Sequence, residues 1–267
     1  MSLQRAAAIV LRQFYLIRGS PSRIFPLFVW VAIDIILWGF ITRYFSSFTG
    51  TGHTLLPSLL GAVLLWDFLT RVMQGVTMAF FEDVWSRNFL NVFASPIRVS
   101  EYVGGLVLSS IVTSSVGLTV MLVVASAAFG LSLFAYGILL VPFLLVLFLF
   151  GIALGILGTA LVLRLGPSAE WFVWPIPAVI SPFAGVFYPI STLPTWMQLI
   201  SRLLPPSYVF EGMRTLVAGG PFSAASLLWG LGLAVLYILL ACGVFMRVFH
   251  HAVRTGLIAR YSAESVS

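Results

Sequence analysis

Six apolar runs, each long enough to cross a lipid bilayer, constrain this chain more than any other feature. A bilayer core about 30 Å thick needs roughly 20 apolar residues of helix for each crossing. The runs lack the period-two alternation of barrel strands, which favours helices. They occupy residues 24–45, 55–80, 102–129, 133–163, 171–190 and 222–245. We therefore expect an all-α integral membrane fold with six transmembrane helices, in a single domain spanning residues 1–267.

The composition agrees with a bilayer as the main solvent. Charged residues make up 8% of the chain and the mean hydropathy is +1.09, whereas a soluble domain carries roughly 25% charged residues. Six crossings and their loops leave little of the 267 residues for a soluble domain.

All 14 basic residues are arginine, and the chain contains no lysine. A P-loop needs its lysine to reach the nucleotide phosphates, so no standard ATP-binding motif is present. The single cysteine, Cys242, and the histidines His53, His250 and His251 do not form a zinc ligand cluster or a disulfide. We expect no enzymatic activity, no metal and no cofactor on this chain. The arginines flank apolar spans, so we expect no nucleic-acid binding either.

The arginines also predict the orientation of the chain, because loops rich in basic residues stay in the cytoplasm. With a cytoplasmic N-terminus, ten loop arginines fall inside and three outside, and both termini are cytoplasmic. The inner ones are Arg5, Arg12, Arg18, Arg23, Arg87, Arg98, Arg164, Arg247, Arg254 and Arg260, and the outer ones are Arg43, Arg202 and Arg214. We expect residues 1–23 to form a cytoplasmic interfacial helix rather than a removable signal peptide.

The longest connections lie on opposite faces of the predicted bundle, at residues 82–101 inside and 191–221 outside. In the inner one, Val84, Phe89 and Val92 lie opposite Asp83 and Arg87 at roughly helical spacing. Such an amphipathic helix can dock on a partner or rest on lipid headgroups. The residue pattern leaves both interpretations open.

Three ionisable residues lie inside the predicted spans. Asp67 and Arg71 are four residues apart and can pair on one helix face, for which we favour a role in helix registration over substrate contact. Asp34 has no local partner, and an unpaired acid at mid-span costs on the order of 2.5 to 3.5 kcal/mol. We expect Asp34 to face another subunit, a water-filled path or a basic group, or to be protonated.

Small residues and prolines predict how two of the spans pack and bend. Gly151, Gly155 and Gly158 in the fourth run allow close helix packing. This run is longer than a crossing requires, so Pro142 either kinks it or one end protrudes. In the fifth run, Trp171 and Trp174 lie close to Pro175, Pro177 and Pro182, and we interpret it as the most deformable span.

Two segments also carry a resemblance to a known family. The inner segment runs from Phe81 through Ala94-Ser95-Pro96 to Tyr102. The outer one runs from Phe187-Tyr188-Pro189-Ile190 through Leu203-Leu204-Pro205-Pro206 to Glu211-Gly212-Met213-Arg214. With these segments in this order and on opposite sides, essentially the whole chain resembles the ABC-2 type permeases of bacterial ABC exporters.

The resemblance implies roles for both segments. Residues 81–101 would contain a cytoplasmic coupling helix between the second and third spans, entering a groove of the ATPase. Its transmitting residues would be Glu82, Asp83, Trp85, Arg87, Asn88 and Phe89. Residues 191–221 would form short re-entrant outer helices between the fifth and sixth spans, at 191–204 and 207–217. The outer residues singled out are Tyr188, Pro189, Leu193, Pro194, Trp196, Pro205, Glu211 and Arg214.

The resemblance further implies an ATP-driven exporter in the bacterial cytoplasmic (inner) membrane. Two copies of the chain would pair as a homodimer above two ATPase subunits that hold ATP and Mg. The substrate would be amphiphilic or polymeric: a polysaccharide, a glycolipid or a drug-like compound. The main alternative is an ion-coupled secondary transporter or channel with Asp34, Asp67 and Arg71 as coupling groups, although no internal repeat supports it. A lipid-modifying membrane enzyme would need an acid or histidine cluster, which the scattered residues do not provide.

Overall fold

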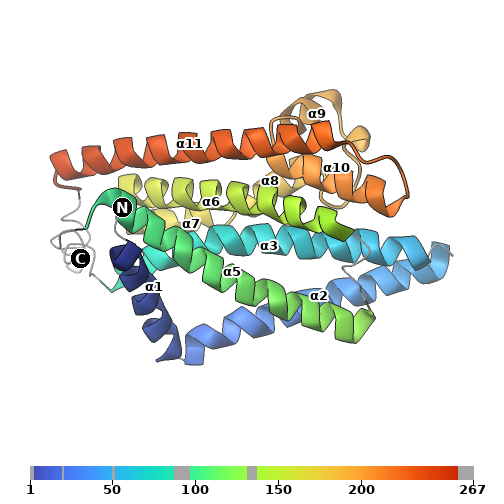
Figure 1. Cartoon of the computed structure of the whole chain (residues 1–267), viewed down its shortest axis with the longest axis horizontal. Helices are drawn as coiled ribbons and strands as arrows, with labels where there is room; N and C mark the ends of the chain where they lie inside the picture. The colour runs from blue at the N-terminus through green and yellow to red at the C-terminus, as the bar shows by residue number, and fades with distance from the viewer. Residues whose placement is uncertain (1–2, 20, 50–51, 87–96, 131–136, 258–267) are drawn as a thin grey trace.

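The computed structural model of the chain is a bundle of long helices with shorter helices at one end (Figure 1). It describes residues 3–19, 21–49, 52–86, 97–130 and 137–257. The long helices are α2 (Pro21–Thr49), α3 (Gly52–Trp85), α5 (Val99–Phe129), α6 (Leu140–Leu165) and α11 (Ala224–Arg254). The shorter ones are α1 (Leu3–Arg18), α7 (Glu170–Val173), α8 (Ile176–Ala184), α9 (Thr195–Ser201) and α10 (Pro205–Val217). Every regular element in the described ranges is helical, which confirms the all-α class.

Four helices in the described part of the chain are long and apolar enough to cross a membrane. These candidate spans are Ser58–Trp85, Val99–Phe129, Gly137–Leu165 and Ala224–Arg254, and they overlap most of the second, third, fourth and sixth apolar runs. The first run lies within α2, a helix of 29 residues. The protein is therefore a multi-pass membrane protein.

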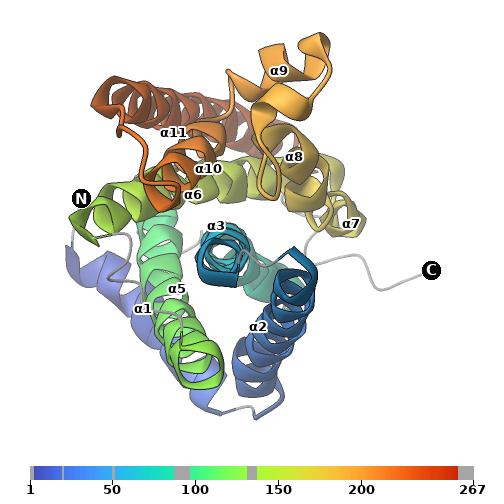
Figure 2. The ribbon, with the colours of Figure 1, turned by 90° about the vertical axis from the view of Figure 1, so that its right-hand side faces the viewer.

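Helix α3 lies in the middle of the bundle, with α2, α5 and α6 arranged around it (Figure 2). The contact with α6 depends on glycine: a Cβ on Gly151 would lie 2.9 Å from the carbonyl oxygen of Leu69, and one on Gly155 would lie 2.9 Å from that of Met73. These distances are too short for a real side chain. The close packing predicted from the glycine spacing is confirmed.

The fifth apolar run does not form one continuous helix. Residues 171–190 contain the four-residue α7, a turn at Trp174-Pro175, and α8, which ends at Gly185. Pro175 and Pro177 lack the backbone N–H groups that would join α7 to α8. Gly185 ends α8 in the left-handed conformation, with φ of 62°. Where the sequence predicts a single span, the structure has two short helices.

The helix formed by the fourth run begins later than the apolar pattern predicts. Helix α6 begins at Leu140, so Pro142 lies in its first turn, where a missing N–H removes no helical hydrogen bond. The kink considered for Pro142 is therefore not needed.

The bundle has two distinct ends (Figure 1). The α1 end holds α1, α7, the C-terminal ends of α3, α6 and α11, and the beginning of α5. The α10 end holds α9, α10, the beginning of α11 and the C-terminal end of α2. The inner and outer segments singled out in the sequence thus lie at opposite ends of the molecule.

Candidate functional site

A buried carboxylate joins three helices at the α1 end. Asp83, in the last turn of α3, has no solvent-exposed surface. It forms an ion pair with Arg12 of α1 and accepts a 2.8 Å hydrogen bond from the hydroxyl of Tyr102 on α5. A charge in this position is stable only when it is paired and hydrogen-bonded. The Asp83 side chain therefore fixes the end of α3 to α1 and α5.

Two further hydrogen bonds strengthen the same end. The amide of Gln13 on α1 donates to the carbonyl oxygen of Ala79 on α3 at 3.2 Å. The indole N–H of Trp85 donates to the carboxylate of Glu170 on α7 at 2.9 Å. The C-terminal end of α3, from which the chain continues toward α5, is thus connected to α1, α5 and α7.

The residues expected to transmit ATPase motion divide into two groups. Glu82, Asp83 and Trp85 lie in the final turns of α3, where Glu82 is partly buried, Asp83 fully buried and Trp85 exposed. Arg87, Asn88 and Phe89 lie outside the described residues. The Asp83 side chain is enclosed within the chain, between Arg12 of α1 and Tyr102 of α5.

Helix α1 packs Ile9, Arg12 and Gln13 against the bundle and leaves several large apolar side chains exposed. Ile9 is buried against α5, where a Cβ on Gly105 would lie 2.5 Å from its terminal methyl. Leu11, Phe14 and Tyr15 are more than half exposed, while Arg12 reaches inward to Asp83. An outward apolar face suits a helix that contacts lipid, as expected for the interfacial segment.

The three ionisable residues of the spans lie together. Arg71 pairs with Asp67 at 3.3 Å along α3, as the spacing predicts, and Asp34 on α2 interacts electrostatically with the same guanidinium. Arg71 also lies against Gly117 of α5, where a Cβ would come within 3.0 Å of its side chain. Of the alternatives considered for Asp34, a nearby basic group is therefore present. These charges connect α2, α3 and α5.

At the α10 end, Glu211 and Arg214 attach the loop after α8 to α10. The carboxylate of Glu211 accepts a 2.7 Å hydrogen bond from the backbone N–H of Ile190 and a 3.0 Å bond from Arg214. Arg214 also donates to the carbonyl oxygen of Val186 at 3.2 Å. The sequence predicted both residues as part of this segment, and the structure brings them together.

The other residues singled out at this end shape its short helices. Pro189 and Pro194 precede a short 3-10 turn and α9, and Pro205 occupies the first turn of α10. The carbonyl oxygen of Leu193 accepts a bond from Gln198 at 2.8 Å. The Tyr188 hydroxyl donates to the Pro182 carbonyl at 2.8 Å, and Trp196 packs edge-on against Phe183. Helix α10 covers the predicted range 207–217, whereas α9 occupies only residues 195–201 of the predicted range 191–204.

Three residues of the α1 end were not identified as candidates from the sequence: Arg12, Tyr102 and Glu170. Each lies far along the chain from its partner, by 71, 19 and 85 residues respectively. The available signal was Asp83 itself, an acid at the end of an apolar helix, which requires a partner if it is buried. In the described residues, no three acid, histidine or cysteine side chains are grouped to hold a metal ion.

The fold and these sites define a class: a multi-pass helical membrane protein with a charge-linked joint at one end and a group of short helices at the other. A family model narrows the class, since the model for the ABC-2 type transporter matches residues 6–218, about four-fifths of the chain. The chain belongs to the ABC-2 type transporter family, whose members are the membrane components of ABC transporters. The matched range runs from α1 through α10. A search of curated proteins gives no significant match.

Proposed function

We propose that this chain is the membrane-spanning permease of an ATP-driven exporter that moves an amphiphilic substrate across the bacterial cytoplasmic membrane. The substrate class is a polysaccharide, a glycolipid or a drug-like compound. The observation that carries the proposal is the family match over residues 6–218. The lysine-free sequence supports the division of labour, because ATP hydrolysis must then occur on a separate ATPase subunit.

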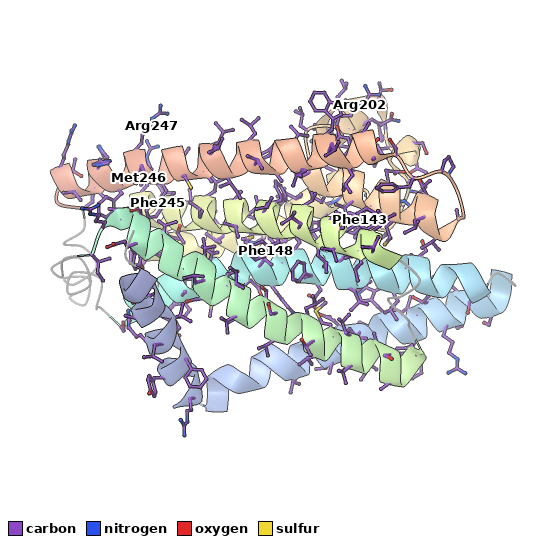
Figure 3. The ribbon with its side chains drawn as sticks, viewed as in Figure 1. Phe143, Phe148, Arg202, Phe245, Met246 and Arg247 are labelled. Carbon is purple, nitrogen blue, oxygen red and sulfur yellow. The ribbon has the colours of Figure 1, made fainter. Side chains whose placement is uncertain are left out.

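The distribution of arginine supports a cytoplasmic location for the α1 end. Figure 3 labels Arg247 near one end of the bundle and Arg202 near the other. The described arginines of the α1 end outnumber those of the α10 end, which favours the α1 end as the cytoplasmic side. They are Arg5, Arg12, Arg18, Arg23, Arg98, Arg164, Arg247 and Arg254, against Arg43, Arg202 and Arg214.

Six crossings would be made by α2, α3, α5, α6, the interrupted pair α7–α8, and α11. With the α1 end inside, both termini are cytoplasmic and α9–α10 form the outer re-entrant segment. Two copies of the chain would form the translocation path, with two ATPase subunits holding ATP and Mg below them.

Coupling to the ATPase would pass through the segment that follows α3. Its root is attached to α1 and α5 through Asp83 and to α7 through Trp85. A push on Glu82, Arg87, Asn88 or Phe89 would therefore move several helices together rather than bend one loop. This is the property that a force-transmitting element needs.

The proposal is tested by co-expressing the chain with a candidate ATPase subunit and reconstituting both in nanodiscs. We expect the two subunits to co-purify in equal numbers, and the permease alone to hydrolyse no ATP. Glu82→Arg and Arg87→Glu should each reduce coupled ATPase activity and dye or glycolipid efflux from vesicles, with insertion unchanged. Arg43→Glu, an exposed charge at the α10 end, is the matched control.

Normal efflux after both reversals would remove the coupling assignment. Efflux driven by an ion gradient in vesicles without any ATPase would instead establish the secondary-transporter alternative, with Asp34, Asp67 and Arg71 as its first residues to test.

A further inference from the structure

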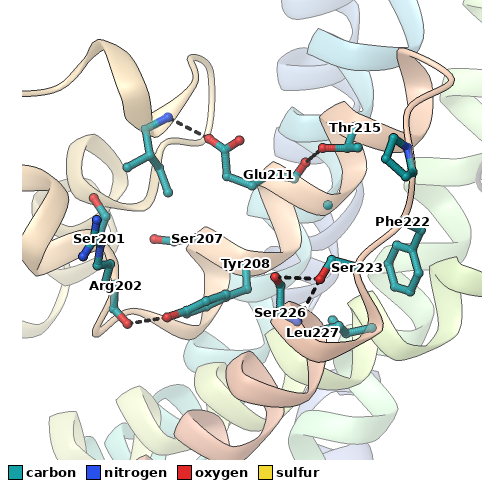
Figure 4. A pocket seen from close by; sticks show the side chains of 13 residues that line it. Ser201, Arg202, Ser207, Tyr208, Glu211, Thr215, Phe222, Ser223, Ser226 and Leu227 are labelled. Carbon is teal, nitrogen blue, oxygen red and sulfur yellow. Dashed lines mark hydrogen bonds between the residues drawn. The ribbon is translucent and has the colours of Figure 1, made fainter.

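A cavity of about 260 Å³ lies at the α10 end, between the end of α9, α10 and the first turn of α11 (Figure 4). Drug-sized ligands occupy pockets of about 300 Å³ or more, so this cavity has room for a single ring-sized group. Its walls come from consecutive elements of one segment, and the fold alone forms it without a second copy of the chain.

The cavity contains a buried hydroxyl that has no hydrogen-bond partner in the described part of the protein. Ser207, in the first turn of α10, is only 2% exposed, and its Oγ bonds to nothing. In Figure 4 this hydroxyl points into the space between the end of α9 and α10. Because buried polar groups in native proteins are almost always satisfied, an unpaired hydroxyl facing a cavity points to a ligand.

Two more groups in the wall can hydrogen-bond to a ligand. Ser223 Oγ accepts from both the backbone N–H and the hydroxyl of Ser226, which leaves the Ser223 proton available for donation. Glu211 uses its Oε1 atom for Ile190 and Arg214, which leaves Oε2 as an acceptor for a ligand. The wall therefore presents hydroxyl donors and a carboxylate acceptor.

The remaining wall is aromatic or apolar and is held in place. The Tyr208 hydroxyl donates to the Arg202 carbonyl at 2.8 Å, and Phe222 packs edge-on against Phe143 of α6. A rigid aromatic wall can receive the apolar face of a saturated ring. The charges of the lining, Arg202 and Glu211, cancel, so it offers no net attraction to an anion such as phosphate.

We propose that this cavity binds a neutral, hydroxyl-bearing ring of the sugar type. Ser207, Ser223 and Glu211 would hydrogen-bond to the hydroxyls of the ring. Tyr208 and Phe222 would pack against its apolar face. The inference rests on the proposed function, since the ring would belong to the exported substrate. Among the substrate classes considered, it selects those that carry a sugar.

The test uses the full-length permease in phosphatidylcholine nanodiscs, purified without sugar-headed detergents. Saturation-transfer difference NMR measures binding of glucose and N-acetylglucosamine, with inorganic phosphate and benzyl alcohol as anionic and apolar probes. We expect a saturable signal from at least one monosaccharide that neither other probe displaces. Ser207→Ala should weaken it about fivefold, the effect of one lost hydrogen bond. Ser191→Ala, an exposed residue outside the cavity, should not change it.

Thermal unfolding of the ligand-free protein separates binding from structure. Ser207→Ala should unfold at the wild-type temperature or above, because the hydroxyl it removes has no partner. Absence of monosaccharide binding, equal binding by Ser207→Ala, displacement by phosphate or benzyl alcohol, or a lowered unfolding temperature would each overturn the assignment. The binding assay contains no ATPase, so it is independent of the coupling experiment. If the permease stimulates its ATPase in that experiment but binds no sugar here, only the cavity assignment is overturned.

Discussion

The two ends of the bundle use charged residues in different ways. At the α1 end, the fully buried Asp83 joins three helices through an ion pair and a hydrogen bond. At the α10 end, the Glu211–Arg214 pair is partly exposed, with 41% of the Glu211 side chain accessible, and it attaches a loop to one short helix. A buried joint resists separation, whereas exposed contacts exchange readily with water. The comparison indicates a stiff α1 end and a more easily rearranged α10 end.

The largest effect should follow Asp83→Ala. The change leaves Arg12 without its counter-ion and Tyr102 without its acceptor, and loss of one partner from a buried ion pair costs about 3–5 kcal/mol. Denaturant unfolding in nanodiscs measures the change. The double variant Arg12→Met with Asp83→Leu should recover most of the stability, since a packed apolar pair can replace a buried ion pair. Wild-type stability of Asp83→Ala would show that the α1 end is not held by this charge.

An intermediate effect should follow Gly155→Ala, which tests the α3–α6 contact between the two ends. The added Cβ would meet Val76 at 2.7 Å and the Met73 carbonyl at 2.9 Å, and overpacking of this kind costs about 1–3 kcal/mol. The matched control is Gly243→Ala on α11, where no atom lies within 4 Å. Alanine has a greater helix propensity than glycine, so Gly243→Ala should raise the free energy of unfolding by up to about 1 kcal/mol. Equal effects at the two positions in the same unfolding assay would contradict the close contact.

The smallest effect should follow Arg214→Met at the α10 end. The change removes the bonds to Val186 and Glu211, and we expect a loss of about 1 kcal/mol because water can replace part of these contacts. Arg43→Met, an exposed arginine on α2, serves as the control and should stay within about 0.5 kcal/mol of wild type. A loss at Arg214 as large as that at Asp83 would remove the contrast between the ends.

The sequence predicted the parts of the fold that depend on local patterns. The apolar runs at 55–80 and 102–129 lie within α3 and α5, and all but the first two residues of 222–245 lie within α11, because length and hydropathy decide a crossing helix. The short helices after the fifth run were expected from the family resemblance, not from a local pattern. The fifth run was harder, since its apolar composition predicts a span while its prolines break the helix.

The candidate sites were predictable only where both partners lie on one helix. The Asp67–Arg71 pair followed from a spacing of four residues. The partner of Asp83 could not be found this way, because Arg12 is brought to it only by the packing of α1 against the bundle. For the same reason, the sequence could not show that Asp34 on α2 lies near Arg71 on α3.

The interrupted fifth run determines which side of the molecule can face lipid tails. Pro182 has no N–H to give to the carbonyl of Ala178, so this oxygen lacks its usual helical donor, and Ala178 is on the exposed surface. Lipid hydrocarbon has no hydrogen-bond donor that could replace the missing N–H group. At this one carbonyl of α8, water or another polypeptide surface is therefore a better neighbour than an acyl chain.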